Sequence, residues 1–438
     1  MKNSVQIDFF NSNSYADKKV DIKSVIENVR DFQKQLLSWP VDKIIHLIDR
    51  FSEQLLDRAN PIHQEYPGSG IPFLAAWCRR RQLESLLKNA FHNFAFLDAF
   101  TESFARPDVE FRAFPKGIAV HWMAGNVPTL GFLSMIMGLL TKNANIIKVS
   151  SISDRLLSDL LSQFSLIEAE SEFSGKGLVN SLAVIRYNRE DTAVSQLLSS
   201  VADVRIFWGS DESVQSLQSF PAKLDSRDII FPNRTSFIVL GADYIEDRMA
   251  EHIAKRMAQD ISLFEQKACA SPHTVFLLTD DANKINAFAL TLKEALAKAL
   301  KTFPKITPSE KEVSAILNLR ARYDMMHEAY YSEGTEFTIL VDDLFQLGPA
   351  IGNRTIYLRP VGNIDQLVDL VTPNVQTVGI AAEKTVCDHI TNVLGACGVH
   401  RFTNIGTMTH FDLPWDGYLL PQNLVRWTSR PAKSNSAT

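Results

Sequence analysis

The chain has 438 residues, about three times the usual size of a single domain, so two or three domains are expected. Its 45 lysine and arginine residues face 50 aspartate and glutamate residues, and the net charge of −5 excludes the strongly basic balance typical of nucleic-acid binding. The four cysteines, Cys78, Cys269, Cys387 and Cys397, are too few for a disulfide-stabilised scaffold, so we expect a reduced, cytoplasmic protein.

We expect no targeting or membrane element in the two ends or in the most apolar segment. The first eight residues lack a long apolar run and do not resemble a signal peptide. The longest apolar stretch, 127–140, is interrupted by polar residues and is shorter than the roughly 20 apolar residues that cross a bilayer, so it predicts a buried helix. The last seven residues, 432–438, are small and polar and predict a frayed end.

The first hundred residues are predicted to be mostly helical, because apolar residues between 36 and 56 recur at helical spacing with Pro40 as a break. After Pro115 the pattern changes to alternating strands and helices, which is typical of a mostly parallel sheet. The elements predicted in this series are the strand 117–122, a helix opening at Pro128, the strand 145–149, the helix 153–167, and the strands 182–185 and 204–208.

A second alternating series begins near Thr235. Its predicted strands are 237–240, 274–278, 355–358 and 377–380, and its helices include 244–260, 282–300 and 364–370. Two consecutive series of this kind predict two doubly wound α/β domains with a ligand site in the cleft between them.

Cys269 is the cysteine best placed to react. It lies on a loop between a predicted helix that ends near Ile261 and the strand that begins at Thr274. Its small neighbours leave room for an acyl group, and Lys267 would favour the thiolate. We therefore treat Cys269 as a candidate nucleophile, with a buried, inert thiol as the alternative, whereas the other three cysteines fall in segments predicted as packed helix.

Two junctions between a strand and a helix carry further polar groups. Asn126 precedes the helix at Pro128, where its amide could stabilise an oxyanion or simply cap the helix. Gly209 and Ser210 follow another strand and could approach a dinucleotide phosphate. This second indication is weak alone, because the chain has neither a Gly-x-Gly-x-x-Gly nor a Gly-x4-Gly-Lys-Ser/Thr motif.

Together these segments resemble the aldehyde dehydrogenase superfamily in order and spacing: Asn126-Val127-Pro128, Ile147-Lys148-Val149-Ser150, Phe207-Trp208-Gly209-Ser210, then Cys269. More narrowly, the chain looks like the long-chain acyl-CoA reductases of the bacterial luminescence operons, the LuxC-like family. The narrower resemblance rests on the segments 121–128 (HWMAGNVP), 266–272 (QKACASP) and 412–418 (DLPWDGY). It covers most of the chain from about Phe111 onward.

The resemblance implies a role for each matching residue. Cys269 matches the catalytic cysteine, and Asn126 matches the asparagine that forms the oxyanion hole with the cysteine's own N–H. Lys148 matches the lysine that contacts the adenosine ribose. Gly209 and Ser210 match the pair at the N-terminus of the helix below the dinucleotide pyrophosphate.

Ser151 departs from the superfamily pattern. Many NAD-preferring members carry a glutamate at this position, three residues after the ribose lysine. A carboxylate there would repel a 2′-phosphate, whereas a serine can donate to it. The sequence therefore predicts NADPH rather than NADH.

A second departure concerns the glutamate that activates water in the hydrolytic aldehyde dehydrogenases. The corresponding segment here, 230–235, contains no carboxylate. Because release of a free acid needs such a base, this departure favours reduction of a thioester over oxidation of an aldehyde to an acid. Glu265, close to Cys269 in sequence, is the alternative base.

We therefore expect NADPH-dependent reduction of a fatty acyl-CoA or acyl-protein thioester to an aldehyde through an S-acyl intermediate on Cys269. The alternatives are a CoA-acylating aldehyde dehydrogenase that acts on a shorter aldehyde, and a non-reducing acyl-carrier or scaffold subunit that docks an acyl-activating enzyme. No metal is expected, because Cys387 and His389, two apart in one predicted helix, point to different faces and form no zinc site with Cys397 and His400.

The resemblance also implies the domain organisation of an α/β, aldehyde dehydrogenase-like fold. Four segments are predicted, namely a mostly helical N-terminal segment packing on the cofactor domain (1–110), a dinucleotide-binding α/β domain (111–233), a catalytic α/β domain (234–405) and a C-terminal segment (406–438). Superfamily members pair through strands near the chain's end. We therefore expect a homo-oligomer whose contact element lies between Arg401 and Trp427.

Overall fold

The structure is a computed structural model that describes residues 4–170 and 172–432. It divides into two compact units. Unit 1 comprises Met1–Tyr66, Gly70–Pro232 and Tyr418–Thr438, and unit 2 comprises Pro67–Ser69 and Asn233–Gly417. Residues 1–3 and 433–438, on which parts of the leader and frayed-end predictions fall, lie outside the described residues. No helix in the described part of the chain is long and apolar enough to cross a membrane.

Unit 1 is built on a seven-stranded sheet in the order β11-β10-β5-β6-β9-β1-β2. The first five strands of this order run parallel, and β1 runs antiparallel to β9 and to β2. The bounds are β1 Ser4–Phe10, β2 Asn13–Asp21, β5 Ile118–Trp122, β6 Ala144–Lys148, β9 Leu182–Arg186, β10 Val204–Trp208 and β11 Arg227–Phe231. The four strands predicted between Pro115 and Trp208 are confirmed as β5, β6, β9 and β10.

The β1–β2 hairpin was not predicted, although the rest of the N-terminal segment is largely helical as expected. Val5, Ile7 and Phe9 are buried and alternate with more polar residues, which is the two-residue period of a strand with one covered face. The hairpin extends the sheet because β1 pairs with β9, a strand much later in the sequence. The helical spacing of apolar residues within 36–56 gave no information on the pairing of β1 with β9.

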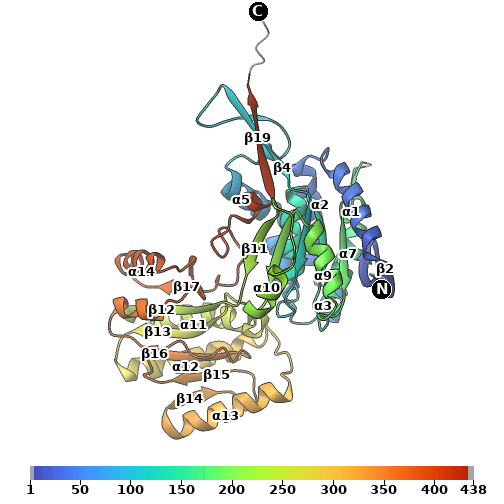
Figure 1. Ribbon diagram of the computed structural model, residues 1–438. Coiled ribbons are helices and arrows are strands. Elements are labelled where there is room, and N and C mark those ends of the chain that lie inside the picture. Colours follow the sequence, from blue (N-terminus) through green and yellow to red (C-terminus); the bar gives the residue numbers. More distant parts are fainter. Residues whose placement is uncertain (1–3, 171, 433–438) are drawn as a thin grey trace, which may run out of the picture. The chain divides into compact units, whose positions relative to one another are not determined.

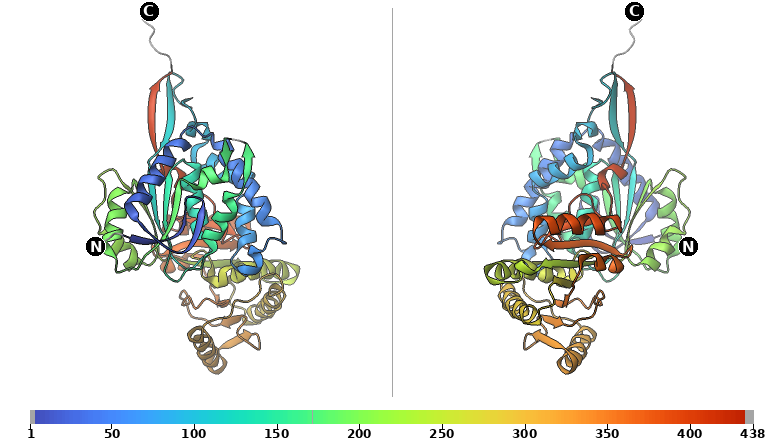
Figure 2. Two further views of the ribbon diagram at one scale, coloured as in Figure 1. Left: turned by 90° about the vertical axis from the view of Figure 1, so that its right-hand side faces the viewer. Right: turned by 90° about the vertical axis from the view of Figure 1, so that its left-hand side faces the viewer.

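Helices cover both faces of the unit 1 sheet (Figure 2). Apolar residues of α1, α9 and α10 pack on one face. On α2, α6 and α7 the rings of Phe51, Phe132 and Phe164 pack together, with centroids 5.0 to 6.3 Å apart. The helices of unit 1 are α1 Ile22–Leu36, α2 Val41–Leu56, α3 Ile62–Glu65, α4 Ile71–Trp77, α5 Arg80–Phe91, η1 Phe94–Leu97, α6 Leu130–Leu140, α7 Leu156–Ser165, α8 Gly175–Val179, α9 Thr192–Val201, α10 Asp211–Gln218 and α15 Leu420–Asn423.

Two small antiparallel sheets complete unit 1. In the first, β19 (Val425–Pro431) lies along β4 (Val109–Pro115), which also pairs with β3 (Thr101–Glu102) (Figure 1). The second joins β7 (Glu168–Glu170) and β8 (Phe173–Ser174). The segment expected to mediate oligomerisation therefore ends in a strand that pairs with β4 of its own chain, and contact between copies stays a prediction.

Unit 2 contains a second seven-stranded sheet in the order β14-β15-β16-β13-β12-β17-β18. All neighbouring strands run parallel except β14 and β15. The bounds are β12 Thr235–Gly241, β13 Pro272–Leu278, β14 Glu328–Tyr331, β15 Thr338–Val341, β16 Thr355–Pro360, β17 Val375–Ala381 and β18 Arg401–Asn404. The predicted α/β class with two mostly parallel sheets is thus confirmed.

The helices of unit 2 also lie on both faces of their sheet. Apolar residues of α11 and α12 pack on one face, and those of η4, α13 and α14 pack on the other. The bounds are η2 Ala242–Tyr244, α11 Asp247–Ser262, η3 Leu263–Gln266, α12 Ala282–Ala299, α13 Glu310–Met326, η4 Ile364–Leu370 and α14 Lys384–Ala396. The helix predicted at 364–370 forms as a 3-10 helix, η4.

Candidate active site

The predicted cofactor residues gather around one cavity in unit 1. The cavity has a volume of about 370 Å³ and lies where the parallel strands β5, β6, β9 and β10 end. This edge of a parallel sheet is where ligands of such folds bind. All four predicted cofactor residues line it, namely Lys148, Ser151, Gly209 and Ser210.

Lys148 ends β6 and presents an unpaired cation to this cavity. Its Nζ lies 5.3 Å from the centroid of the Tyr187 ring, and it makes no hydrogen bond or ion pair with any residue that the structure describes. Burial, followed by the charges of Arg186 and Arg189, lowers the pKa of Lys148. A ligand hydroxyl or phosphate oxygen would therefore relieve an uncompensated charge, which fits a ribose contact.

Ser151 lies on a loop after β6, and Arg186 donates hydrogen bonds to the backbone of this loop. Arg186 Nη1 donates to the carbonyl oxygens of Ser150 at 2.6 Å and Ser151 at 3.1 Å, and Nη2 donates to Asp8 Oδ2 at 2.7 Å. A Cβ added to Gly125, which also lines the cavity, would lie 3.1 Å from Ser150 Cβ. The loop is therefore closely packed on both sides.

Gly209 and Ser210 link β10 to α10 as predicted. The Ser210 side chain caps α10 by accepting a hydrogen bond from the backbone N–H of Ser213. Ser210 and Ser213 line the cavity, whereas the acidic residues of the first helical turn, Asp211 and Glu212, do not. The N-terminal end of α10 thus offers hydroxyl and backbone N–H donors to an anion, which suits a pyrophosphate.

Arg189 is a cavity residue that sequence reasoning missed. It is exposed, lies three residues after β9 and makes no hydrogen bond or ion pair with a described residue. Its position in the first turn beyond a predicted parallel strand was the available indication, because such turns carry ligand contacts in α/β sheets. An arginine there suits a phosphate group.

Cys269 lies in unit 2, on the loop between η3 and β13, and is half-buried. Its carbonyl oxygen accepts a hydrogen bond from Ser236 Oγ at 2.8 Å, which fixes the loop to β12. Burial, followed by the negative charge of Asp416, raises the pKa of the Cys269 thiol to about 12. Hydrogen bonds from the Gln376 side chain and from the backbone N–H groups of Ala270 and Cys269 act in the opposite direction.

The prediction that Lys267 favours the thiolate is not supported. Lys267 Nζ lies 3.3 Å from Glu312 Oε1 on α13. The charge that most affects Cys269 is the carboxylate of Asp416, which favours the protonated thiol. Neighbouring positions in sequence were therefore a poor guide to the electrostatic surroundings of the sulfur.

Glu265 is engaged elsewhere and is poorly placed to act as a free base. Its buried carboxylate accepts a 2.6 Å hydrogen bond from Arg354 Nη2 and another from Lys305 Nζ. Phe264, Glu265 and Gln266 all have positive φ angles, between 53 and 58°, which disfavours ordinary side chains. The ion pairs of Glu265 therefore stabilise an unusual backbone conformation just before the cysteine.

Asn126 lies in unit 1, after β5, and its side chain is exposed. Because Asn126 and Cys269 belong to different units, their pairing as an oxyanion hole stays a prediction. His121, near Asn126 in sequence, is fully buried between Ser134 Oγ at 2.8 Å and Asn145 Oδ1 at 3.0 Å. Burial lowers the pKa of His121 to about 4, so it serves as a neutral packing residue.

The other three cysteines lie apart from this chemistry. Cys78 is buried at the end of α4, Cys387 Sγ donates to the carbonyl oxygen of Ala382, and Cys397 is exposed at the end of α14. His389 Nε2 lies 2.8 Å from Asp365 Oδ1. Within residues 4–170 and 172–432, no group of three or more His, Cys, Asp or Glu side chains is arranged to hold a metal ion.

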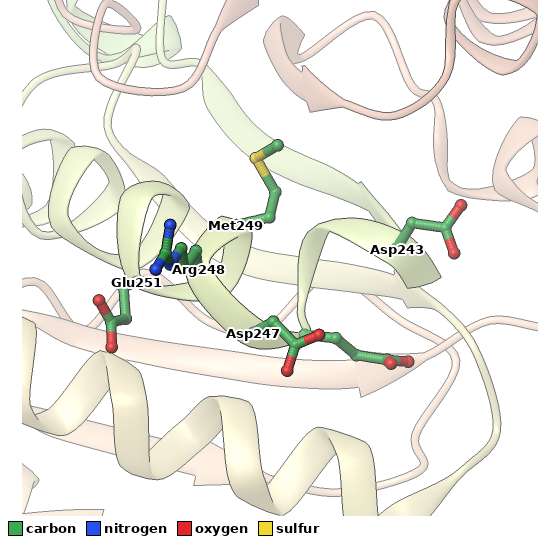
Figure 3. A pocket seen from close by; sticks show the side chains of 6 residues that line it. Asp243, Asp247, Arg248, Met249 and Glu251 are labelled. Carbon is green, nitrogen blue, oxygen red and sulfur yellow. The ribbon is translucent and has the colours of Figure 1, made fainter.

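A larger hollow of about 820 Å³ in unit 2 surrounds the start of α11 and has no connection with the predicted site residues. Figure 3 shows its side chains, which come from η2, the residue before α11 and the first turns of α11. Carboxylates predominate among them, and this disfavours a phosphate or thioester ligand. Its lining residues are Asp243, Glu246, Asp247, Arg248, Met249 and Glu251.

Comparison with known proteins agrees with this arrangement. Residues 36–427 match the family model described as acyl-CoA reductase (LuxC). The chain is 28% identical to the long-chain acyl-protein thioester reductase of Aliivibrio fischeri over 339 residues, which cover 76% of this chain and 68% of the relative. It is 26% identical to long-chain acyl-protein thioester reductase 2 of Photobacterium leiognathi, over 82% of this chain and 73% of the relative.

Solved structures show the same fold at low sequence identity. Aldehyde dehydrogenase 21 of Physcomitrella patens, solved with the product succinate, is 13% identical, with a TM-score of 0.67 and 99% of both chains covered. Betaine aldehyde dehydrogenase of Staphylococcus aureus, solved with NAD⁺, is 12% identical, with a TM-score of 0.64, covering 100% of this chain and 93% of the other. The predicted aldehyde dehydrogenase-like fold is confirmed.

Proposed function

The chain belongs to the acyl-CoA reductase (LuxC) family of oxidoreductases, and we propose that it reduces a fatty acyl thioester to an aldehyde with NADPH, through an S-acyl intermediate on Cys269. The observation that carries the proposal is the cavity of unit 1, which brings Lys148, Ser151, Gly209 and Ser210 together where the parallel strands end. The printed names of the relatives, long-chain acyl-protein thioester reductases, support a fatty acyl thioester as substrate.

NADPH, when bound, would supply the hydride. Lys148 and Ser151 would contact the adenosine ribose, and Arg189 would contact its 2′-phosphate. Ser210 and the first N–H groups of α10 would bind the pyrophosphate. The donors in this cavity are cationic or neutral, and its lining contains no carboxylate that would repel a 2′-phosphate.

Cys269 would act on the acyl donor first. Its sulfur would form a bond to the thioester carbonyl carbon, and the donor thiol would leave when the original carbon–sulfur bond breaks. The Cys269 N–H and the Asn126 amide would stabilise the oxyanion, a contribution of roughly 3 kcal/mol for each well-placed donor. Reduction of the S-acyl group would release the aldehyde and return the free sulfur.

Protection of the S-acyl enzyme from water is consistent with the surroundings of Cys269. The segment 230–235 has no carboxylate, and the neighbouring Glu265 is occupied by Lys305 and Arg354. An acyl-enzyme without a water-activating base persists until it is reduced or transferred to another thiol.

The test is NADPH oxidation with acyl-CoA thioesters of increasing chain length, combined with mass spectrometry of the trapped acyl-enzyme. Cys269→Ala should abolish both acylation and NADPH oxidation, while Cys397→Ala, at an exposed cysteine, should retain both. Acylation without NADPH consumption would instead identify a scaffold subunit. Efficient NADP⁺ reduction with short aldehydes and coenzyme A, but no thioester reduction, would identify an acylating dehydrogenase.

Two further parts of the proposal concern partners. We propose that an acyl-activating enzyme supplies the thioester and that copies of the chain associate through the region 401–427. Light scattering of the purified protein at several concentrations tests the second point, and a monomer at every concentration would contradict it.

A further inference from the structure

The segment 412–418, one of those that carry the family resemblance, places a buried carboxylate near the proposed nucleophile. The Asp416 side chain is 1% exposed, and its Oδ1 accepts a hydrogen bond of 2.6 Å from Gln376 Nε2. Ser236 Oγ donates to the Cys269 carbonyl oxygen at 2.8 Å and accepts a 3.3 Å hydrogen bond from the backbone N–H of Thr377, so Gln376, the preceding residue, lies beside the cysteine loop, and its side chain lowers the pKa of the thiol. Cys269, Gln376 and Asp416 all belong to unit 2, where Gln376 lies on β17 and Cys269 precedes β13. The amide thus bonds the carboxylate directly and lies beside the loop that carries the sulfur.

The carboxylate determines which end of the Gln376 amide can face it. A glutamine amide has a donating NH₂ group and an accepting oxygen, whereas an ionised carboxylate only accepts. Asp416 therefore selects the NH₂ end of Gln376. That nitrogen carries two hydrogens, so one can bond Asp416 while the other is available to the sulfur. A donor to the thiolate stabilises the charged form of a cysteine.

We infer that Gln376 is a catalytic residue that donates to the reacting sulfur of Cys269, and that Asp416 is a positioning residue that holds the Gln376 amide in the donating orientation. This inference rests on the proposed function only in taking Cys269 as the nucleophile. Asp416 has a second effect, because its negative charge disfavours the thiolate through space. Gln376 and Asp416 therefore act on the thiol in opposite directions.

The other charged groups around these three residues are few. Arg234 Nε lies 3.6 Å from Asp416 Oδ1, and His400 Nδ1 lies 4.0 Å from the same oxygen. Burial, followed by the charge of Arg234, lowers the pKa of His400, so this histidine is neutral throughout the alkaline range. The guanidinium of Arg401 adds a positive charge that interacts with Cys269. Arginine does not titrate in this range, so the pH dependence of the thiol reports on Cys269 and its carboxylate neighbour.

Alkylation of Cys269 by iodoacetamide tests the inference without substrate or cofactor. The full chain carries Cys387→Ser and Cys397→Ser, and Cys78 is fully buried, so the alkylated peptide identifies Cys269. The rate is measured from pH 6 upward, since only the thiolate reacts.

Two substitutions should shift this profile in opposite directions. Gln376→Met removes the donor and should move the profile to higher pH, with alkylation about tenfold slower at a fixed pH below the midpoint. Asp416→Asn keeps an oxygen that can accept from Gln376 but removes the charge. It should move the profile to lower pH, with alkylation about tenfold faster at that fixed pH.

Matched controls lie on η4, where Gln366→Met and Asp369→Asn make the same changes at exposed positions and should leave the profile unchanged. Should Gln376→Met not fold, Gln376→Asn shortens the amide by one methylene and carries the same expectation. If the pH profiles of Gln376→Met and Asp416→Asn shift in the same direction, or do not shift, the inference is overturned. This holds even if Cys269→Ala abolishes reduction. Opposite shifts in a chain whose Cys269→Ala variant still reduces thioesters would support the inference on the thiol while refuting its catalytic use.

Discussion

The buried Asp8 and the partly buried Arg186 form an ion pair that connects the β1–β2 hairpin to the loop after β6. Arg186 Nε and Nη2 donate to Asp8 Oδ2 at 3.1 and 2.7 Å, and the Asp8 side chain is 2% exposed. The remaining nitrogen, Nη1, donates to the carbonyl oxygens of Ser150, Ser151 and Ser153. One guanidinium therefore fixes both β1 and the loop that carries Ser151.

Asp8→Asn should weaken cofactor binding without touching the cavity itself. Loss of the carboxylate leaves the partly buried Arg186 without its charge partner, so the loop after β6 loses its fixed support. We expect the Kd for NADPH, measured by quenching of tryptophan fluorescence, to rise about tenfold. Asp17→Asn, at an exposed carboxylate of β2, is the matched control and should bind NADPH like the unmodified chain. If Asp8→Asn and Asp17→Asn bind NADPH with equal affinity, Asp8 does not support the loop.

Ser151→Glu should reverse the expected cofactor preference. A carboxylate at this position would repel the 2′-phosphate of NADPH and could accept hydrogen bonds from the ribose hydroxyls of NADH. We expect the ratio of kcat/KM for NADPH to that for NADH to fall by about two orders of magnitude.

The control for this charge is Ser200→Glu, at an exposed serine of α9 that does not line the cavity. It should leave the ratio unchanged. A preference for NADH in the unmodified chain would show that Ser151 does not confer the specificity proposed for it.

Much of the fold was predictable because it depends on local pattern. Apolar runs bounded by turns predicted the central parallel strands. The family resemblance, rather than local pattern, indicated Lys148, Gly209 and Ser210 together, and these residues line one cavity. The β1–β2 hairpin was missed even though Val5, Ile7 and Phe9 alternate as in a strand, because its partner β9 lies far along the chain.

The electrostatics of the site were less predictable. Lys267 lies two residues before the proposed nucleophile, yet the charge that most affects Cys269 is that of Asp416, far along the chain. Such effects depend on distance in space and on burial, neither of which follows from local sequence. The motif around Asp416 indicated importance through resemblance alone and gave no role.

Glu265→Gln should destabilise unit 2 strongly. The side chain of Glu265 is 4% exposed and that of Arg354 is 1% exposed, so the substitution leaves buried cations without a counter-charge. Breaking a buried pair in this way costs about 3–5 kcal/mol, which should appear as a lower free energy of unfolding in urea. Glu294→Gln, in the exposed pair with Lys298, should change it by less than about 1 kcal/mol. A Glu265→Gln protein with the same free energy of unfolding as the unmodified chain would contradict the structural role of Glu265.

His121 should make the stability of unit 1 sensitive to acid. Burial lowers the pKa of His121 from 6.5 to about 4, so the folded state binds its proton less tightly than the unfolded state does. The stabilising contribution of the neutral ring is therefore fully present above about pH 6.5 and is lost as the pH falls toward 4. The shift corresponds to roughly 3 kcal/mol across this window.

His121→Gln removes the titrating ring while keeping an amide that can donate to Asn145 Oδ1. We expect this variant to be less stable than the unmodified chain at pH 7, since Ser134 loses its hydrogen bond with His121 and keeps only the one from Trp208, but to lose less stability between pH 6.5 and 4. Urea denaturation at a series of pH values, followed by tryptophan fluorescence, measures both effects. His252→Gln, at an exposed histidine of α11, should preserve the original pH dependence. The same acid sensitivity in the His121→Gln chain would mean that His121 does not cause it, and that other buried groups such as His273, whose pKa burial also lowers to about 4, are responsible.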